Sequence, residues 1–316
     1  MGEEILKVHG SGNTFYLIDG ENGSHNWVEL TKWLCQPQHD GGADGLLVVL
    51  PSEHADARMR VINADGSEAS MCGNGLRCVA RYVLNNLNKE EAVIETMKAN
   101  LKVKKDGELA EGIEAFSVEI APVLFNLSSL PMVYHDETKL INQKLPELSM
   151  DINFTAVAVP NPHLIAMVTK SYIENTTHQQ ELAQMLNGKN AYTPDGVNVS
   201  YVLPLSHNEI FVRTYERGVG FTNACGTAMT ASSLVATLLN LVDEEVVTVY
   251  NPGGFVKCLI KHTEEHTALS LIGNATYLKK ARLHKKETSY SMTDSIDLGE
   301  QALYELQMQK IHERIK

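Results

Sequence analysis

"NADGSEASMCGNGLRC", from Asn63 to Cys78, places a cysteine between a polar loop and an amphipathic stretch. Cys72 is followed at once by Gly-Asn-Gly, and the residues beyond it carry apolar side chains at the spacing of one helical face. These side chains belong to Leu76, Val79, Ala80, Val83 and Leu87. The pattern predicts a helix over residues 72–87 that begins at Cys72.

"YERGVGFTNACGTAMTAS", from Tyr215 to Ser232, repeats the arrangement around Cys225, which is followed by Gly-Thr-Ala. The apolar spacing here predicts a second helix over residues 225–241. The two cysteines lie close to half a chain length apart, and each follows a strand-like run and a polar, glycine-containing loop. The repetition indicates an internal duplication into two similar α/β halves with one cysteine each.

Short β-type runs, separated by Gly, Asn, Asp and Pro, make up most of the remaining chain. They cover residues 14–19, 45–50, 57–63, 92–97, 115–120, 155–159, 164–169, 197–203, 209–216, 246–250 and 268–273. Weaker helical patterns cover residues 26–35 and 179–186. The segment between Pro122 and Pro131 is predicted to link the two halves.

A polar tail runs from Lys285 to Lys316. The sequence leaves two alternatives for it, an amphipathic helix or a largely disordered segment. The apolar face of the helix would comprise Ile296, Leu303, Leu306 and Ile311.

The composition of the 316 residues is that of a globular protein, with 43% hydrophobic and 21% charged residues. A net charge of −12 argues against a general nucleic-acid binder, because such proteins need basic residues to follow the phosphates. No run of about 20 apolar residues is present, and the first residues lack the pattern of a secretory signal. We therefore expect a cytoplasmic protein that does not bind membranes.

Cysteine usage points to free thiols rather than to disulfides or metal ligands. Five cysteines, without a secretory signal and without any C-x-x-C pair, argue against a disulfide framework and against a zinc site. Cys35, Cys78 and Cys258 are interpreted as small buried apolar residues.

A cysteine at the first turn of a helix faces backbone N–H groups that have no intrahelical partner. These groups favour the thiolate, and such cysteines can have a pKa of roughly 3.5–7.5 instead of about 8.5. The following glycine leaves the N–H groups open to a carboxylate or phosphate. Two such sites could invert a carbon stereocentre, one group removing a proton and the other delivering one to the opposite face. Only one cysteine should be ionised at a time, because two buried like charges repel.

Five ordered blocks of this sequence resemble the diaminopimelate epimerase family, cofactor-independent enzymes of lysine and peptidoglycan-precursor synthesis. The blocks are "HGSGNTF" (residues 9–15), the stretch 63–78, "VPNPHLI" (159–165), "PDGVNVSYV" (194–202) and "YERGVGFTNACGT" (215–227). The resemblance implies an α/β (α+β) fold with two pseudo-symmetric domains. Each would be a curved, mostly antiparallel sheet around a central helix, and the active site would lie in the cleft between them.

The domain boundaries implied by the resemblance divide the chain into three parts. Residues 1–122 would form the N-terminal half together with a returning strand near 268–283. Residues 123–267 would form the C-terminal half, and residues 285–316 the polar tail.

The resemblance also implies a reaction and its residues. LL- and meso-diaminopimelate would be interconverted without pyridoxal phosphate or metal, with Cys72 and Cys225 as the catalytic acid and base, in a homodimer. The substrate-binding positions would be Asn13, Asn63, Gly73, Asn74, Asn161, Asn198, Glu216, Arg217, Gly226 and Thr227. His163 and Glu216 would modulate the pKa values of the cysteines.

The chemistry of these residue types suits such a substrate. The planar guanidinium of Arg217 can hold a distal carboxylate through two hydrogen bonds, and asparagines offer both donors and acceptors to an ammonium–carboxylate pair. Four positions depart from the commoner pattern: Thr14, Gly45, Phe221 and Ala228. These four departures leave the expected reaction class unchanged, but they bear on the expected substrate selectivity.

Two other functions remain open. A two-cysteine racemase of another amino acid would use the same proton transfer, and a redox sensor would use the same cysteine pair. A cysteine phosphatase does not fit, because it needs five residues between cysteine and arginine, and Cys72 and Arg77 are separated by four.

Overall fold

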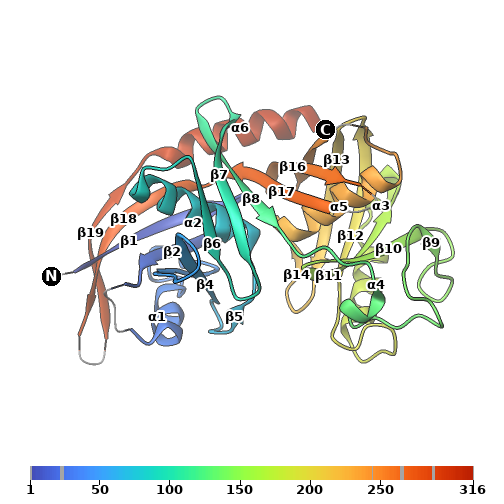
Figure 1. Ribbon diagram of the computed structural model, residues 1–316, viewed down its shortest axis with the longest axis horizontal. Helices are drawn as coiled ribbons and strands as arrows, with labels where there is room; N and C mark the ends of the chain where they lie inside the picture. The colour runs from blue at the N-terminus through green and yellow to red at the C-terminus, as the bar shows by residue number, and fades with distance from the viewer. Residues whose placement is uncertain (1, 22–24, 244, 264–266, 287–288, 316) are drawn as a thin grey trace. The chain divides into compact units, whose positions relative to one another are not determined.

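The computed structural model describes residues 2–21, 25–243, 245–263, 267–286 and 289–315, with side chains as far as residue 310. The chain divides into two compact units, Met1–Val118 with Ile272–Lys316, and Glu119–Leu271 (Figure 1).

The first unit has one central helix and a set of strands (Figure 1). Its elements are β1 (Glu3–Gly10), β2 (Asn13–Asp19), α1 (Trp27–Leu34), β3 (Gly45–Leu50), β4 (Ala57–Asn63), β5 (Glu68–Ala69), α2 (Gly73–Leu87), β6 (Glu91–Glu95), β7 (Asn100–Ala110), β8 (Ile113–Ile120), β18 (Thr276–Lys285), β19 (Tyr290–Asp297) and α6 (Glu300–Ile315). β8 continues past the boundary between the units by two residues.

The second unit contains a second central helix. Its elements are η1 (Leu127–Ser129), β9 (Gln143–Lys144), β10 (Asn153–Val159), β11 (Asn161–Met167), α3 (Lys170–Glu174), α4 (Thr177–Asn187), β12 (Asn198–Ser206), β13 (Glu209–Glu216), β14 (Gly220–Thr222), α5 (Gly226–Leu238), β15 (Val246–Asn251), β16 (Gly254–His262) and β17 (Thr267–Asn274).

The order of strand pairing is the same in the two units. β1 and β2 form an antiparallel hairpin, β2 is parallel to β3, β3 is antiparallel to β4, and β4 is parallel to β6. β10, β11, β12, β13 and β15 repeat these relations in the same sequence. The predicted duplication is therefore confirmed, and the fold is a mixed α/β fold with two pseudo-symmetric halves.

Each central helix is enclosed by the strands of its own unit. α2 contacts β1, β2, β3, β4, β6 and β7, and α5 contacts β10, β11, β12, β13, β15 and β16. Every residue of α5 from Gly226 to Ala236 is buried, as expected for a helix that has no solvent face. The strands thus fix the position of the N-terminus of each helix.

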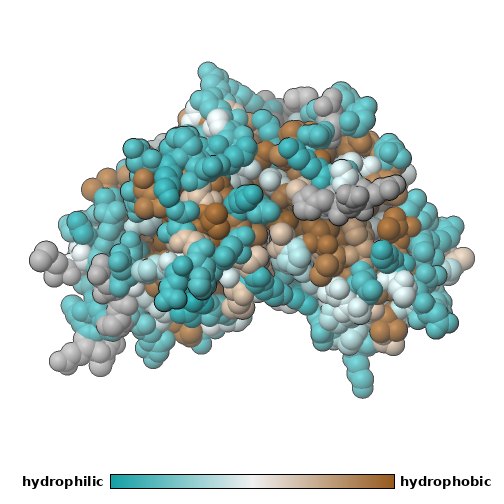
Figure 2. All heavy atoms as spheres, viewed as in Figure 1, coloured by the Kyte–Doolittle hydropathy of each residue, from teal (hydrophilic) through white to brown (hydrophobic). Residues whose placement is uncertain are grey.

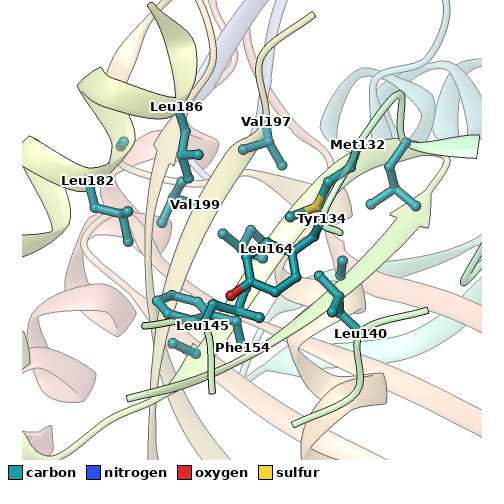
Figure 3. Packing of buried hydrophobic residues seen from close by; sticks show 14 of the residues in the cluster. Met132, Tyr134, Leu140, Leu145, Phe154, Leu164, Leu182, Leu186, Val197 and Val199 are labelled. Carbon is teal, nitrogen blue, oxygen red and sulfur yellow. The ribbon is translucent and has the colours of Figure 1, made fainter. Parts of the chain in front are cut away.

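The segment that the sequence analysis assigned to a linker belongs to the core of the second unit. Leu127 and Leu130 are buried in a hydrophobic cluster with Met132, Tyr134 and Phe154. Figure 3 shows Met132 and Tyr134 packed close to Leu164 on β11. The proline-based prediction of a linker was wrong, because the apolar side chains between the prolines cover the sheet.

The C-terminal tail contains a strand as well as a helix. β19 pairs with β18, so Ile296 lies in a strand rather than in the helix. α6 buries Tyr304, Gln307 and Met308, whereas Leu303 and Leu306 are exposed. The apolar face predicted for this helix was therefore wrong, and the side chain of Ile311 lies outside the described residues.

Polar residues dominate the molecular face in Figure 2, consistent with the burial of the apolar strand and helix residues in the two cores. None of the helices in the described part of the chain is long and apolar enough to cross a lipid bilayer.

The burial of α5 leads to a stability prediction. Leu234 on α5 is 0% exposed, so Leu234→Ala should leave a cavity and lower the free energy of unfolding by about 2–5 kcal/mol. Urea unfolding followed by circular dichroism measures this change. Leu306→Ala is the matched control, since Leu306 is 51% exposed and its truncation should change the free energy by less than about 0.5 kcal/mol. Equal effects of the two variants would contradict the placement of α5 in the core.

Candidate active site

Cys72 caps the N-terminus of α2 with its own side chain. The residue has extended backbone angles, and its Sγ accepts the N–H of Gly75 at 3.4 Å. Its S–H can donate to Asn13 Oδ1, which lies 3.8 Å away. The Gly75 N–H is thus a donor that favours the Cys72 thiolate, and Asn13 Oδ1 is an acceptor that favours the thiol.

The amide of Asn13 is oriented by an aspartate that the sequence analysis did not single out. Asp44 Oδ2 accepts hydrogen bonds from Asn13 Nδ2 at 2.7 Å and from the N–H of Thr14 at 2.8 Å. Asn13 Oδ1 therefore points away from Asp44, and it accepts a hydrogen bond from the Asn74 side chain at 3.4 Å. Thr14 binds Asp44 through its backbone N–H, and its Oγ1 donates to the backbone oxygen of Gly12 at 3.4 Å.

Asn63 and Gly45 shape the same region. Asn63 ends β4, and its Nδ2 donates to Ser67 Oγ at 3.0 Å across the polar loop before Cys72. Gly45 pairs with Asn63, and a Cβ at Gly45 would lie 2.5 Å from the backbone oxygen of Ile62. Glycine is therefore required at this position by the close approach of two strands. Asn13 and Gly75 contact the sulfur of Cys72, and Gly73 and Asn74 follow Cys72 in the first turn of α2.

Cys225 occupies the equivalent position at the start of α5 but in a different environment. It is 8% exposed, and its Sγ lies 3.6 Å from Thr227 Oγ1. Glu216, at the end of β13, accepts a hydrogen bond from Thr222 Oγ1 at 2.5 Å. Thr222 is a second residue that the sequence analysis missed, although its place in the cysteine block was a usable indication.

The electrostatics at Cys225 oppose ionisation. Burial raises the pKa of the Cys225 thiol well above its usual value, and the carboxylate of Glu216 raises that pKa further. Burial also raises the pKa of Glu216, against the hydrogen bond from Thr222. The prediction that a helix N-terminus would lower the pKa is wrong at Cys225, because desolvation and a neighbouring negative charge outweigh the backbone dipoles.

Three further site residues of the second unit lie on adjacent strands or directly after one. His163 on β11 pairs with Asn198 on β12, and Asn198 Oδ1 accepts the N–H of Arg217 at 3.0 Å. Arg217 Nη1 donates to the backbone oxygen of Asp195 at 3.1 Å. Asn161 is the first residue of β11, as Asn13 is of β2. The strand register thus brings His163, Asn198 and Arg217 together.

His163 is a buried imidazole that lacks hydrogen bonds. It is 0% exposed, and neither ring nitrogen has a partner among the residues that the structure describes. Burial lowers the pKa of His163 to about 3, and the positive charge of Arg217 contributes to the shift. A neutral ring with two free nitrogens can therefore bind a polar group brought by a ligand.

The two remaining departures from the family pattern have different surroundings. Phe221 packs edge-on against Tyr215 with ring centroids 5.2 Å apart, and the Arg213 guanidinium lies 5.4 Å from its ring. Ala228 is buried in α5. Within the described ranges, no group of three or more histidine, cysteine, aspartate or glutamate residues has the arrangement of a metal site.

Comparison with known proteins places these residues in a family. The family model of diaminopimelate epimerase matches residues 5–114 and 155–278. A diaminopimelate epimerase of Ligilactobacillus salivarius is 47% identical over 98% of this chain and 99% of its own length. One of Lactiplantibacillus plantarum is 46% identical over 96% of this chain and 97% of its own length.

A solved structure shares the fold at low identity. The PhzF-family phenazine biosynthesis protein of Bacillus anthracis superposes with a TM-score of 0.65 and 15% identity, over 90% of this chain and all of the other. The sequence similarity extends over nearly the whole chain and includes both cysteine segments. This chain therefore belongs to the diaminopimelate epimerase family.

Proposed function

We propose that this protein interconverts LL- and meso-diaminopimelate, with Cys72 and Cys225 as the two acid–base groups. It is an isomerase, as the other members of its family are. The observation that carries the proposal is the duplicated arrangement in which a cysteine starts each enclosed helix. The mechanism requires both sulfurs to reach one α-carbon from opposite faces.

The proposed reaction consists of two proton transfers. A thiolate removes the α-proton and becomes a thiol, and the electron pair of the broken C–H bond moves into the α-carboxylate. The second thiol then gives its proton to the other face of the carbon and becomes the thiolate. The N–H groups at the start of α2 and α5, beginning with those of Gly73 and Gly226, are suited to stabilise the carboxylate charge.

We assign different resting roles to the two cysteines. Cys225 rests as the thiol, because burial and Glu216 oppose its ionisation. Cys72 is then the resting base, with the Gly75 N–H as a donor to its thiolate. Once Cys72 has taken the α-proton, Asn13 Oδ1 can accept the new S–H. After each turnover the protonation states of the two sulfurs are exchanged.

The polar groups of both halves suit a substrate with an ammonium and a carboxylate at each end. Arg217 provides the planar donor pair for the distal carboxylate, and Asn13, Asn63, Asn161 and Asn198 provide both donors and acceptors. Asn74, Thr227 and the helix N–H groups would hold the reacting end. His163 lies beside Asn198 and its ring nitrogens have no partner among the described residues, which supports the proposal that it binds substrate or influences Cys225.

We further propose that the units Met1–Val118 with Ile272–Lys316 and Glu119–Leu271 act as the two epimerase halves. A cytoplasmic location agrees with chemistry that needs free thiols, because the cytoplasm keeps cysteines reduced. A homodimer is proposed on the resemblance to the family alone.

The proposed reaction requires exchange of an α-proton with solvent. Reduced protein incubated with LL-diaminopimelate in deuterated water should incorporate one deuterium at the inverted α-carbon, measured by mass spectrometry and proton NMR. Heat-denatured protein is the control. No incorporation with any diaminopimelate stereoisomer would exclude the proposed function, and incorporation into proline instead would favour a racemase of another amino acid.

The two-sided mechanism makes both cysteines necessary. Cys72→Ala and Cys225→Ala should each lower kcat for epimerisation by about 10²–10⁴-fold, the usual contribution of a general acid or base. Cys35→Ala, which removes a half-buried thiol from the first unit, should leave kcat unchanged. Near-native turnover in either Cys72→Ala or Cys225→Ala would show that one sulfur is sufficient.

The role assigned to Glu216 predicts a change in the reactivity of Cys225. Glu216→Gln removes a negative charge that raises the pKa of this thiol, so the pKa should fall and alkylation by iodoacetamide should begin at lower pH. Mass spectrometry of the peptide that contains Cys225 measures the rate at each pH. Glu209→Gln, on the same strand, is the control. A profile that is unchanged or moved to higher pH in Glu216→Gln would contradict this role.

A further inference from the structure

The turn that carries Asn13 packs directly on the first turn of α2. Ser11 and Gly12 join β1 to β2 with φ angles of 54° and 78°, the two left-handed residues of a tight hairpin turn. A Cβ at Gly10 would lie 2.7 Å from the backbone oxygen of Asn74. The conformation of this turn therefore sets where Asn13 lies relative to Asn74 and Cys72.

His9 makes a hydrogen bond to this turn, and its hydrogen-bond partners fix the tautomer of its ring. The N–H of Gly12 donates to His9 Nδ1 at 3.0 Å, so Nδ1 must carry a lone pair. His9 Nε2 therefore carries the hydrogen, and it donates to Gln301 Oε1 at 2.9 Å. The ring of Tyr304 lies edge-on to His9, with centroids 4.7 Å apart. Both partners on the far side of His9 come from α6.

The same helix is fixed to α2 by a paired ionic contact. Arg81 on α2 donates from Nη1 and Nη2 to the two carboxylate oxygens of Glu300, both at 2.7 Å. Glu300 also accepts the N–H of Tyr277 at 2.8 Å. The first turn of α6 is thereby joined to the helix that Cys72 begins.

The charge state of His9 matters for the turn. Burial lowers the pKa of His9 to about 4, and the ring is 2% exposed. The hydrogen bond to Gln301 raises this pKa in opposition to burial, Arg77 on α2 lowers it, and Glu300 and Glu305 on α6 raise it. The other polar neighbour is Asn274, whose Nδ2 lies 3.4 Å from Nδ1. A protonated Nδ1 could no longer accept from Gly12, so the turn needs a neutral ring.

α6 lies beyond the residues that the family model matches, which end at residue 278. The Ligilactobacillus relative nevertheless aligns with 98% of this chain. We propose that α6 positions the Cys72 side of the active site, and that Gln301 is a positioning residue that holds His9 in the tautomer supporting the Asn13 turn. The catalytic part of this inference rests on the proposed epimerase function.

The first test compares two leucine variants of α6. Gln301→Leu removes the acceptor for His9 Nε2–H and should lower kcat/KM for epimerisation up to about tenfold, the effect of one hydrogen bond of roughly 1 kcal/mol. Gln309→Leu makes the same change at an exposed position of α6 and should leave kcat/KM unchanged. Equal values in the two variants, with an active wild type, would overturn the proposal.

A second variant separates positioning from loss of structure. Gln301→Glu keeps an acceptor for Nε2–H but adds a negative charge that favours the protonated ring. Its activity should approach that of the wild type at high pH, and the acid limb of its pH profile should move to higher pH. A loss that is the same at every pH would indicate a structural role only and would contradict the proposal.

A third measurement needs no substrate. Displacement of Asn13 Oδ1 removes an acceptor for the S–H of Cys72, so iodoacetamide should alkylate Cys72 about threefold faster in Gln301→Leu than in Gln309→Leu. If the wild type lacked epimerase activity, the proposed function would fail while this comparison still tested the positioning role. Unchanged alkylation would then overturn the inference by itself.

Discussion

The backbone N–H groups at the first turns of α2 and α5 are the feature on which the rest of this structure depends. Each helix is in contact with six strands around it, so the position of its N-terminus is fixed. A cysteine at that point has a fixed sulfur, with N–H groups beside it that can stabilise negative charge. In each unit the same order of strands surrounds the helix and holds the cysteine at its N-terminus in place.

The duplication repeats the backbone but not the chemistry. Cys72 has both a donor and an acceptor next to its sulfur, and the acceptor Asn13 is oriented by Asp44. Cys225 lies in a more buried position beside the carboxylate of Glu216. Two sulfurs in matching positions can thus prefer different protonation states at the same pH. A reaction that needs one acid and one base at a time requires such a difference.

The sequence predicted the helices and strands whose apolar residues recur with a regular local period. The cysteine helices and most of the strands with alternating or continuous apolar residues were found, and the spacing of the cysteines revealed the duplication, whereas β1 and β16 were missed. β7 was missed because only Leu101 and Val103 alternate with Lys102 and Lys104 before the polar stretch from Lys105 to Glu108 begins. The 122–131 segment and α6 were misjudged because only tertiary contacts decide which of their apolar side chains are buried.

In the candidate site, the sequence alone indicates the residues at which chemistry and motif coincide, such as the two cysteines, but not the residues that act through another residue. Asp44 and Gln301 reach the Cys72 region through hydrogen bonds with residues distant in sequence, Asn13 and His9, and His9 then accepts the N–H of the nearby Gly12. The most direct test of the assigned roles is the infrared S–H stretching band of the resting enzyme at neutral pH. The account predicts that Cys225→Ala removes an S–H band and that Cys72→Ala does not. A band lost in Cys72→Ala but kept in Cys225→Ala would reverse the assignment and contradict the account.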